Sequence, residues 1–242
     1  MPADQIGMYS RIPKSLDGLY YTALGRNLKV WYDFEDMLEG DNLEQGKWHL
    51  STNGAGAYAQ GTNPLNTRPG ILVFSTGTTA AGRAGAYSLG QSQNGLCFGA
   101  GIYTIESDIY IPDLSTVAEE YIFRFGFGDT VTGDNVDGSY FEYDRLTNVN
   151  WQFCNASNST RTKQDTGFTV NAGTWTRLKV VAELSLARFY INNFYIGASS
   201  GNFPLAGRYL ASTINIIKSA GLTDRTFWCD WIWQHILLNA SR

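Results

Sequence analysis

The chain has 242 residues, of which 14% are aromatic and 17% are charged, and its formal net charge is −4. This length fits one large β domain or two small ones, and it is long enough to bury a hydrophobic core. The low charge and the lack of a basic stripe argue against a nucleic-acid surface, because such surfaces neutralise phosphates with Lys and Arg. No apolar run reaches the roughly 18 residues of a transmembrane helix, so we expect no membrane partner.

The first 28 residues differ in pattern from the rest of the chain. They show no alternation of apolar and polar residues, and their apolar anchors are isolated: Ile12, Leu16, Leu19, Tyr20 and Tyr21. We expect an extended N-terminal arm over 1–28 whose anchors contact either its own domain or a partner. The N-terminus MPADQIGMYSRIPK lacks the apolar stretch of a signal peptide, and the three cysteines are far apart. Both features predict synthesis in a cytoplasm, with reduced core cysteines.

Short segments with period-two alternation follow one another from residue 29 to the end, and they predict one β domain over 29–242. The segment 113–120 begins with the cap-like Asp113 and predicts one helical turn, whereas the Ser/Thr-rich 156–166 predicts a loop. Asn192–Asn193 predicts a tight hairpin turn. The expected strands lie at 29–36, 70–77, 82–90, 99–112, 121–128, 138–144, 148–155, 174–184, 186–197, 208–221 and 226–238.

The stretch 121–151 carries the strongest alternation in the chain. Aromatic side chains occupy one face of its two strands and are expected in the core: Tyr121, Phe123, Phe125, Phe127, Phe141 and Tyr143. Charged and tyrosine side chains occupy the other face, beside two glycines that leave room above the sheet. About a dozen short strands with almost no helix predict an all-β, antiparallel two-sheet β-sandwich.

The order of these segments resembles the concanavalin A-like lectin/glucanase jelly roll. The resemblance rests on PGILVFSTGTTAAGRA, on the pair YIFRFGFGD and GSYFEYD, and on WTRLKVV leading to RFYINNFYIG. The run from Trp175 to Gly197 is similar to the Trp-strand and hairpin of laminin G-like modules, with Asn193 where glycine is usual. The versions it resembles most are found among structural proteins of tailed bacteriophages.

The resemblance implies a non-enzymatic virion protein that is assembled in the cytoplasm of a bacterial host. Capsid decoration, as a cement or head protein, is favoured over a tail module, because fibres usually append this domain to a much longer chain. The implied partners are capsid or other virion proteins and sister copies in a homo-oligomer. The alternative is a carbohydrate-binding tail-fibre or baseplate module that recognises a host surface glycan, because this sandwich hosts several functions.

A glycan on this module would lie on the polar face of the strong strand pair. The expected contacts are Arg124, Tyr140, Glu142, Asp144 and Trp151, because tyrosine and tryptophan stack on ligands with little loss of rotamer freedom. The chain also has more tryptophans than one core comfortably hides, namely Trp31, Trp48, Trp151, Trp228, Trp231 and Trp233. His235 alternates with Trp231 and Trp233, which predicts a buried or interface histidine.

A glycoside hydrolase is the less favoured alternative. Hydrolases of this fold carry Glu-x-Asp-x-x-Glu on one strand, and here Glu142 and Asp144 match while the second glutamate is absent. Glu106 and Asp108 repeat the same spacing on another strand. Arg124 is expected beside Glu142 and would keep a neighbouring carboxylate ionised, which does not suit a general acid. We therefore expect no catalytic residue.

The loop 128–138 carries Asp129, Asp134 and Asp137. Calcium takes six to eight closely spaced oxygen ligands, and many members of this fold bind it in loops. The spacing is not that of an EF-hand, and aspartate is also an ordinary turn residue. We expect no cofactor, with calcium at these three residues as the alternative.

Overall fold

The computed structural model describes residues 19–21, 27–33, 48–61, 68, 70–88 and 95–239, with the backbone alone for 19–21, 27–33 and 60. The described residues form two antiparallel sheets and contain no helix, and hence no helix of the length and apolarity that spans a membrane. The prediction of an all-β, two-sheet sandwich is confirmed.

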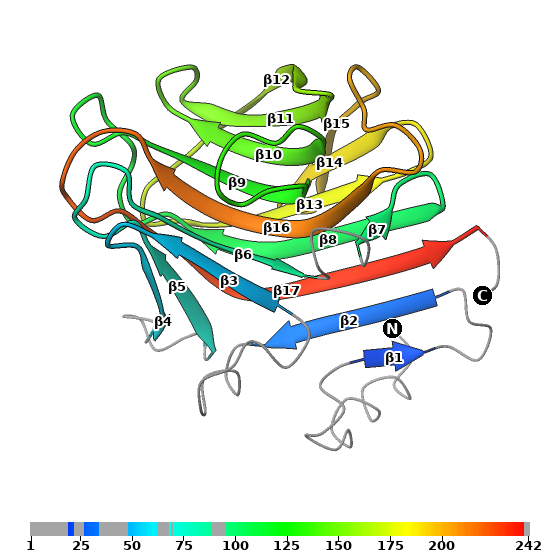
Figure 1. The fold of residues 1–242 in the computed structure, drawn as a ribbon, viewed down its shortest axis with the longest axis horizontal. Helices are drawn as coiled ribbons and strands as arrows, with labels where there is room; N and C mark the ends of the chain where they lie inside the picture. The colour runs from blue at the N-terminus through cyan, green and yellow to red at the C-terminus, as the bar shows by residue number, and fades with distance from the viewer. Residues whose placement is uncertain are drawn as a thin grey trace.

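The first sheet is built around the C-terminal strand. Its neighbours run in the order β1-β2-β17-β8-β13-β14-β15, and β5 pairs with both β17 and β4. In Figure 1 the red β17 lies beside the blue β2, so the two ends of the sequence meet in one sheet. Its strands are β1 Leu19–Tyr21, β2 Asn27–Asp33, β4 Ala57–Gly61, β5 Ile71–Ser75, β8 Gly101–Tyr110, β13 Trp175–Ala182, β14 Ala187–Ile191, β15 Phe194–Ser199 and β17 Thr226–Leu238.

The second sheet runs in the order β12-β11-β10-β9-β16-β6-β3, with β7 paired to β16. Its strands are β3 Trp48–Asn53, β6 Arg83–Ser88, β7 Leu96–Cys97, β9 Tyr121–Gly128, β10 Gly138–Asp144, β11 Asn150–Ser157, β12 Thr160–Thr169 and β16 Tyr209–Lys218. Figure 1 shows β12, β11, β10, β9 and β16 side by side in the upper part of the molecule.

Aromatic side chains join the two sheets. Phe123 of β9 meets Phe227 of β17 with ring centroids 4.8 Å apart, and Phe141 of β10 meets Phe189 of β14 at 5.3 Å. Such edge-to-face pairs add about 0.5–1.5 kcal/mol beyond the area that they bury. The six aromatic residues predicted for the core from 121–143 are all buried. Period-two alternation therefore identified this inner face correctly.

Two local expectations need correction. The segment 113–120 is irregular, because Tyr121 donates its hydroxyl to the Asp113 carbonyl and its amide to Ser115 Oγ, which holds the chain in turns. The predicted loop 156–166 contains most of β12, an exposed edge strand whose threonines favour extended backbone. An edge strand exposed on both faces needs no apolar alternation, so the pattern hid it.

The N-terminal arm is described only in part. Leu19, Tyr20 and Tyr21 form β1, which pairs with β2 of the same chain, so this part of the expected arm is a strand of the sandwich. The boundary expected after residue 28 falls inside β2. Ile12 and Leu16 lie outside the described residues, and the partner of residues 1–18 stays a prediction.

Candidate functional site

The polar face of β9 and β10 is covered, contrary to the expectation of an open surface. Arg124, Tyr140, Glu142 and Asp144 are 3%, 0%, 0% and 7% exposed. Trp151 points into the core, where its ring lies 5.7 Å from that of Phe123. None of the five predicted glycan contacts offers an accessible side-chain surface in this structure.

The β9–β10 loop supplies the cover. Arg124 donates to the Gly133 carbonyl at 2.7 Å and pairs with Asp134 at 2.5 Å, which ties the loop to the sheet. Arg124 also donates from Nε to Glu142 at 2.7 Å, and Lys163 pairs with the other oxygen of that carboxylate. This buried ion-pair network fixes the loop over the strands.

The three aspartates considered for calcium have separate protein partners. Asp129 accepts the amides of Val136 and Asp137, Asp134 pairs with two arginines, and Asp137 accepts the amide of Asn158. Among the described residues no three His, Cys, Asp or Glu side chains converge as metal ligands. Calcium at this loop therefore gains no support from the geometry.

The outer face of the first sheet carries half-buried cationic and aromatic side chains above two buried carboxylates, Glu106 (7% exposed) and Asp108 (4% exposed). On β8, Glu106 and Asp108 point outward while Ile105 and Ile109 face the core, as their alternation predicts. Glu106 pairs in register with Lys179 of β13, and Asp108 pairs with Arg177. Directly opposed strand partners share a face, so opposite charges lie side by side across the two strands.

A β-bulge in β17 brings two more side chains to this face. Cys229 pairs with Ile109 and Ile232 with Ser107, so β17 holds one residue more than β8 between these pairs. The extra residue lets Asp230 and Trp231 both lie away from the core, while the thiol of buried Cys229 donates to the Trp231 carbonyl at 3.7 Å. The bulge also marks where β17 changes neighbour from β5 to β2. Bulges of this kind re-aim side chains next to functional sites.

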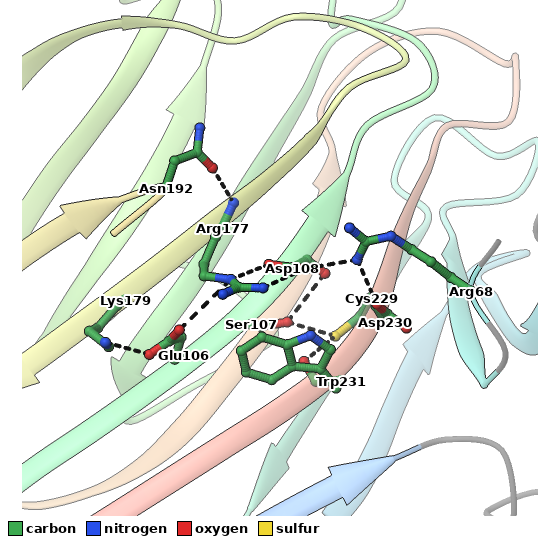
Figure 2. A network of polar contacts seen from close by, with 10 residues as sticks. All are labelled: Arg68, Glu106, Ser107, Asp108, Arg177, Lys179, Asn192, Cys229, Asp230 and Trp231. Atoms are coloured by element: carbon green, nitrogen blue, oxygen red, sulfur yellow. Dashed lines mark hydrogen bonds and ion pairs between the residues drawn. The ribbon is translucent and has the colours of Figure 1, made fainter. Parts of the chain in front are cut away.

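Arginines link the carboxylates of the two central strands. Arg68 contacts Asp108 at 2.8 Å and Asp230 at 2.6 Å. Arg177 donates from Nε to Asp108 at 2.7 Å and lies 3.8 Å from Glu106, and Lys179 contacts Glu106 at 2.6 Å. Figure 2 shows Arg177 reaching from β13 toward both carboxylates of β8.

These contacts keep Asp108 ionised. Burial by itself would raise the pKa of Asp108, but hydrogen bonds from Arg177 and Arg68 outweigh it and bring that pKa below its ordinary value. The hydrogen bond to Asp108 raises the pKa of Arg177 in turn. Asp108 is therefore a carboxylate at neutral pH, and the three acidic and three basic side chains balance.

A depression of about 310 Å³ opens on this face, lined by Glu106, Arg177, Lys179, Trp231 and Trp233. The Arg177 guanidinium lies 5.1 Å from the Trp231 ring centroid, which fixes the orientation of the indole. His235 lies beside Trp233 with ring centroids 5.7 Å apart. An aromatic wall next to a carboxylate and two cations can hold a small polyhydroxylated ligand.

The tryptophans divide between core and surface. Trp48 and Trp151 are buried, so only Trp151, the expected glycan contact, needs correction, while Trp228, Trp231 and Trp233 are half-buried on the outer face of the first sheet. The Trp31 side chain is not described. The alternation in WCDWIW and in TWTRLKV was a usable signal for this face, but the bulge and the Arg68 contacts have no signature in the sequence.

A family model, the SO2946-like C-terminal domain, matches residues 67–226. This range runs from the Arg68 segment to the first residue of β17. No curated protein matches the chain.

Solved structures with the same fold come from proteins of different kinds. A protein of unknown function, SO2946 from Shewanella oneidensis MR-1, is 14% identical with a TM-score of 0.66, over 100% of this chain and 97% of that one. The Emp47p carbohydrate recognition domain is 12% identical with a TM-score of 0.55, over 94% of this chain and 99% of that one. A glycoside hydrolase family protein from Mycobacterium thermorestibile is 14% identical with a TM-score of 0.54, over 84% of this chain and 98% of that one. The sandwich thus has the concanavalin A-like fold that the sequence resembles.

Proposed function

The chain belongs to the family of SO2946-like C-terminal domains, and on this premise we propose that it is a non-enzymatic carbohydrate-binding module. Its ligand lies in the depression on the outer face of the first sheet. The observation that carries the proposal is the pair Trp231 and Trp233 beside Glu106, Arg177 and Lys179.

Each part of this depression suits a sugar. The apolar face of a pyranose ring stacks on an indole, which buries area with few rotamers to fix. The Glu106 carboxylate accepts hydrogen bonds from hydroxyl groups, and the planar Arg177 guanidinium donates to neighbouring ones. The carbohydrate recognition domain of Emp47p shares the fold, which makes the proposal consistent with one use of this sandwich.

The partners of the carboxylates on this face support binding rather than hydrolysis. Glycoside hydrolysis needs one protonated acid beside an ionised carboxylate. Asp108 is held ionised by two arginines, and Glu106 is paired with Lys179 at 2.6 Å. The other matching pair is unsuited too, because Glu142 is fully buried between Arg124 and Lys163.

We further propose that the protein is a component of a phage virion. It would serve either as a capsid decoration protein or as a tail-fibre or baseplate module, with sister copies as partners. Its support is the resemblance of the sequence to structural proteins of tailed bacteriophages. Deletion of residues 1–18 leaves β1 and β2 in place, and we expect it to abolish co-sedimentation with phage particles while glycan binding persists. If the deletion variant associated with phage particles as well as the wild type does, residues 1–18 would not be the particle-binding segment.

A glycan array tests the binding role directly. Wild-type protein is expected to retain a defined set of glycans, and Trp231→Ala and Trp233→Ala are each expected to lose them, because each removes part of the stacking wall. Tyr209→Ala is the matched control, an exposed aromatic residue on β16 of the second sheet. Retention of no glycan by the wild type, or undiminished retention by both tryptophan variants, would refute the proposal.

A further inference from the structure

Two tyrosines continue the aromatic surface beyond the depression. Tyr190 of β14 and Tyr195 of β15 are directly opposed in register, and their ring centroids lie 5.5 Å apart. Tyr195 is 57% exposed, whereas Phe189, the neighbour of Tyr190, is buried in the core. Since successive side chains alternate between faces, the tyrosine pair lies on the outer face of the first sheet.

Lys179 joins this pair to the depression. Its ammonium lies 5.8 Å from the Tyr190 ring centroid and contacts Glu106 at 2.6 Å. One side chain of β13 therefore contacts both the tyrosine pair and a wall of the depression. The aromatic and polar side chains run without a break from β17 to β15.

The length of this run follows from the strand order. From β17 the strands proceed through β8, β13 and β14 to β15. Four inter-strand steps of about 4.8 Å give a track of about 19 Å at right angles to the strands. This is longer than a single sugar ring, so the geometry suits an oligosaccharide chain.

The charges on the track point to the nature of that chain. Arg68, Arg177 and Lys179 each pair with a carboxylate, with N···O distances of 2.8 Å, 2.7 Å and 2.6 Å. A carboxylated sugar would have to displace one of these carboxylates and leave it without its counter-charge, which is costly at a partly buried site. A neutral hydroxyl array can instead bond to the carboxylates and the cations while the pairs stay intact.

We propose that the outer face of the first sheet is an extended site for a neutral oligosaccharide, with Trp231 and Trp233 at one end and Tyr190 and Tyr195 at the other. This inference rests on the proposed function and specifies the ligand of the same site. The tyrosine pair forms the subsite that distinguishes long chains from short ones.

The test uses an array of neutral and of uronic- or sialic-acid-containing glycans of graded length, followed by titration of each retained glycan. We expect retention of neutral chains, with affinity rising with length. Tyr195→Ala should weaken the longest chains by roughly 3- to 10-fold, the value of one aromatic contact, and leave the shortest retained glycan unchanged. Phe194→Ala is the control, because this exposed neighbour on β15 points to the opposite side of the strand.

The outcomes separate the two proposals. Three outcomes would overturn the extended neutral site and leave the binding module standing. They are glycan retention that depends on Trp233 but not on Tyr195, retention that is independent of chain length, and retention that selects acidic glycans. Retention of no glycan by the wild type would overturn both.

Discussion

Arg124 donates a hydrogen bond from Nε to Oε2 of Glu142 at 2.7 Å, and the two side chains are 3% and 0% exposed on the outer face of the second sheet. A buried carboxylate between Arg124 and Lys163 is stable only while both charges are matched. Glu142 thereby holds the Arg124 guanidinium, which in turn binds the β9–β10 loop at Gly133 and Asp134.

Loss of the Glu142 charge should therefore be costly. Glu142→Gln leaves the buried Arg124 guanidinium short of its counter-charge, and we expect the free energy of unfolding to fall by about 3 kcal/mol or more. Urea unfolding at pH 7 measures the change. Glu183→Gln is the control, because its partner Arg188 is 41% exposed and such pairs contribute about 1 kcal/mol or less. Equal losses in the two variants would contradict the role of burial.

The Asp108 network should depend on pH. The pKa of Asp108 lies below its ordinary value, so its contribution to stability is present above pH about 4 and is lost as the pH falls through the folded-state pKa. We expect Asp108→Asn to lower the free energy of unfolding by about 1–3 kcal/mol at pH 7, with the difference shrinking below pH about 4.

Denaturant melts of both proteins at pH 7 and pH 3 test this. Asp113→Asn serves as the control, since its carboxylate is 67% exposed and lies 3.9 Å from Arg225. A difference between wild type and Asp108→Asn that is the same at both pH values would show that the carboxylate charge is not the cause.

Alanine substitutions at three glycines should distinguish the cost of backbone strain from the cost of a steric clash. A Cβ at Gly77 (φ 64°) would lie 2.0 Å from the Ala55 carbonyl oxygen, whereas Gly167 (φ 71°) and Gly133 have no atom within 4 Å. We expect Gly77→Ala to destabilise by more than about 2 kcal/mol, Gly167→Ala by about 1 kcal/mol from its left-handed backbone alone, and Gly133→Ala by less than about 0.5 kcal/mol. Thermal unfolding of the three variants gives the order, and any other order would contradict this division.

The cysteines should differ in reactivity. Cys154 and Cys229 are buried, and burial raises the pKa of both thiols, whereas Cys97 is partly accessible. Because the thiolate is the reactive species, iodoacetamide at pH 8 is expected to label Cys97 in the folded protein and the other two only after unfolding. Peptide mass spectrometry reads out the sites. Early labelling of Cys229 would indicate that the β17 bulge opens.

Much of the sandwich could be predicted from alternation alone. The strands at 121–128 and 138–144 and the hairpin at Asn192–Asn193, whose φ values are 51° and 68°, follow from local pattern and turn chemistry. The edge strand β12 could not be predicted, because a strand without a buried face leaves no apolar period. The hydrophobic pattern indicates which strands have a buried face, and it does not predict a strand that buries few side chains.

The sequence by itself determined which side chains share a face, since side chains alternate along an extended strand whatever surrounds it. Only the tertiary structure decided which polar face stays accessible. The β9–β10 loop covers Arg124 and Glu142. On the other sheet the bulge in β17 and the approach of Arg68 leave Trp231 and Arg177 partly accessible above the buried carboxylates of Glu106 and Asp108. Strand order and loop placement depend on contacts between distant segments, so two Glu-x-Asp strands that look alike in the sequence have different surroundings in the fold.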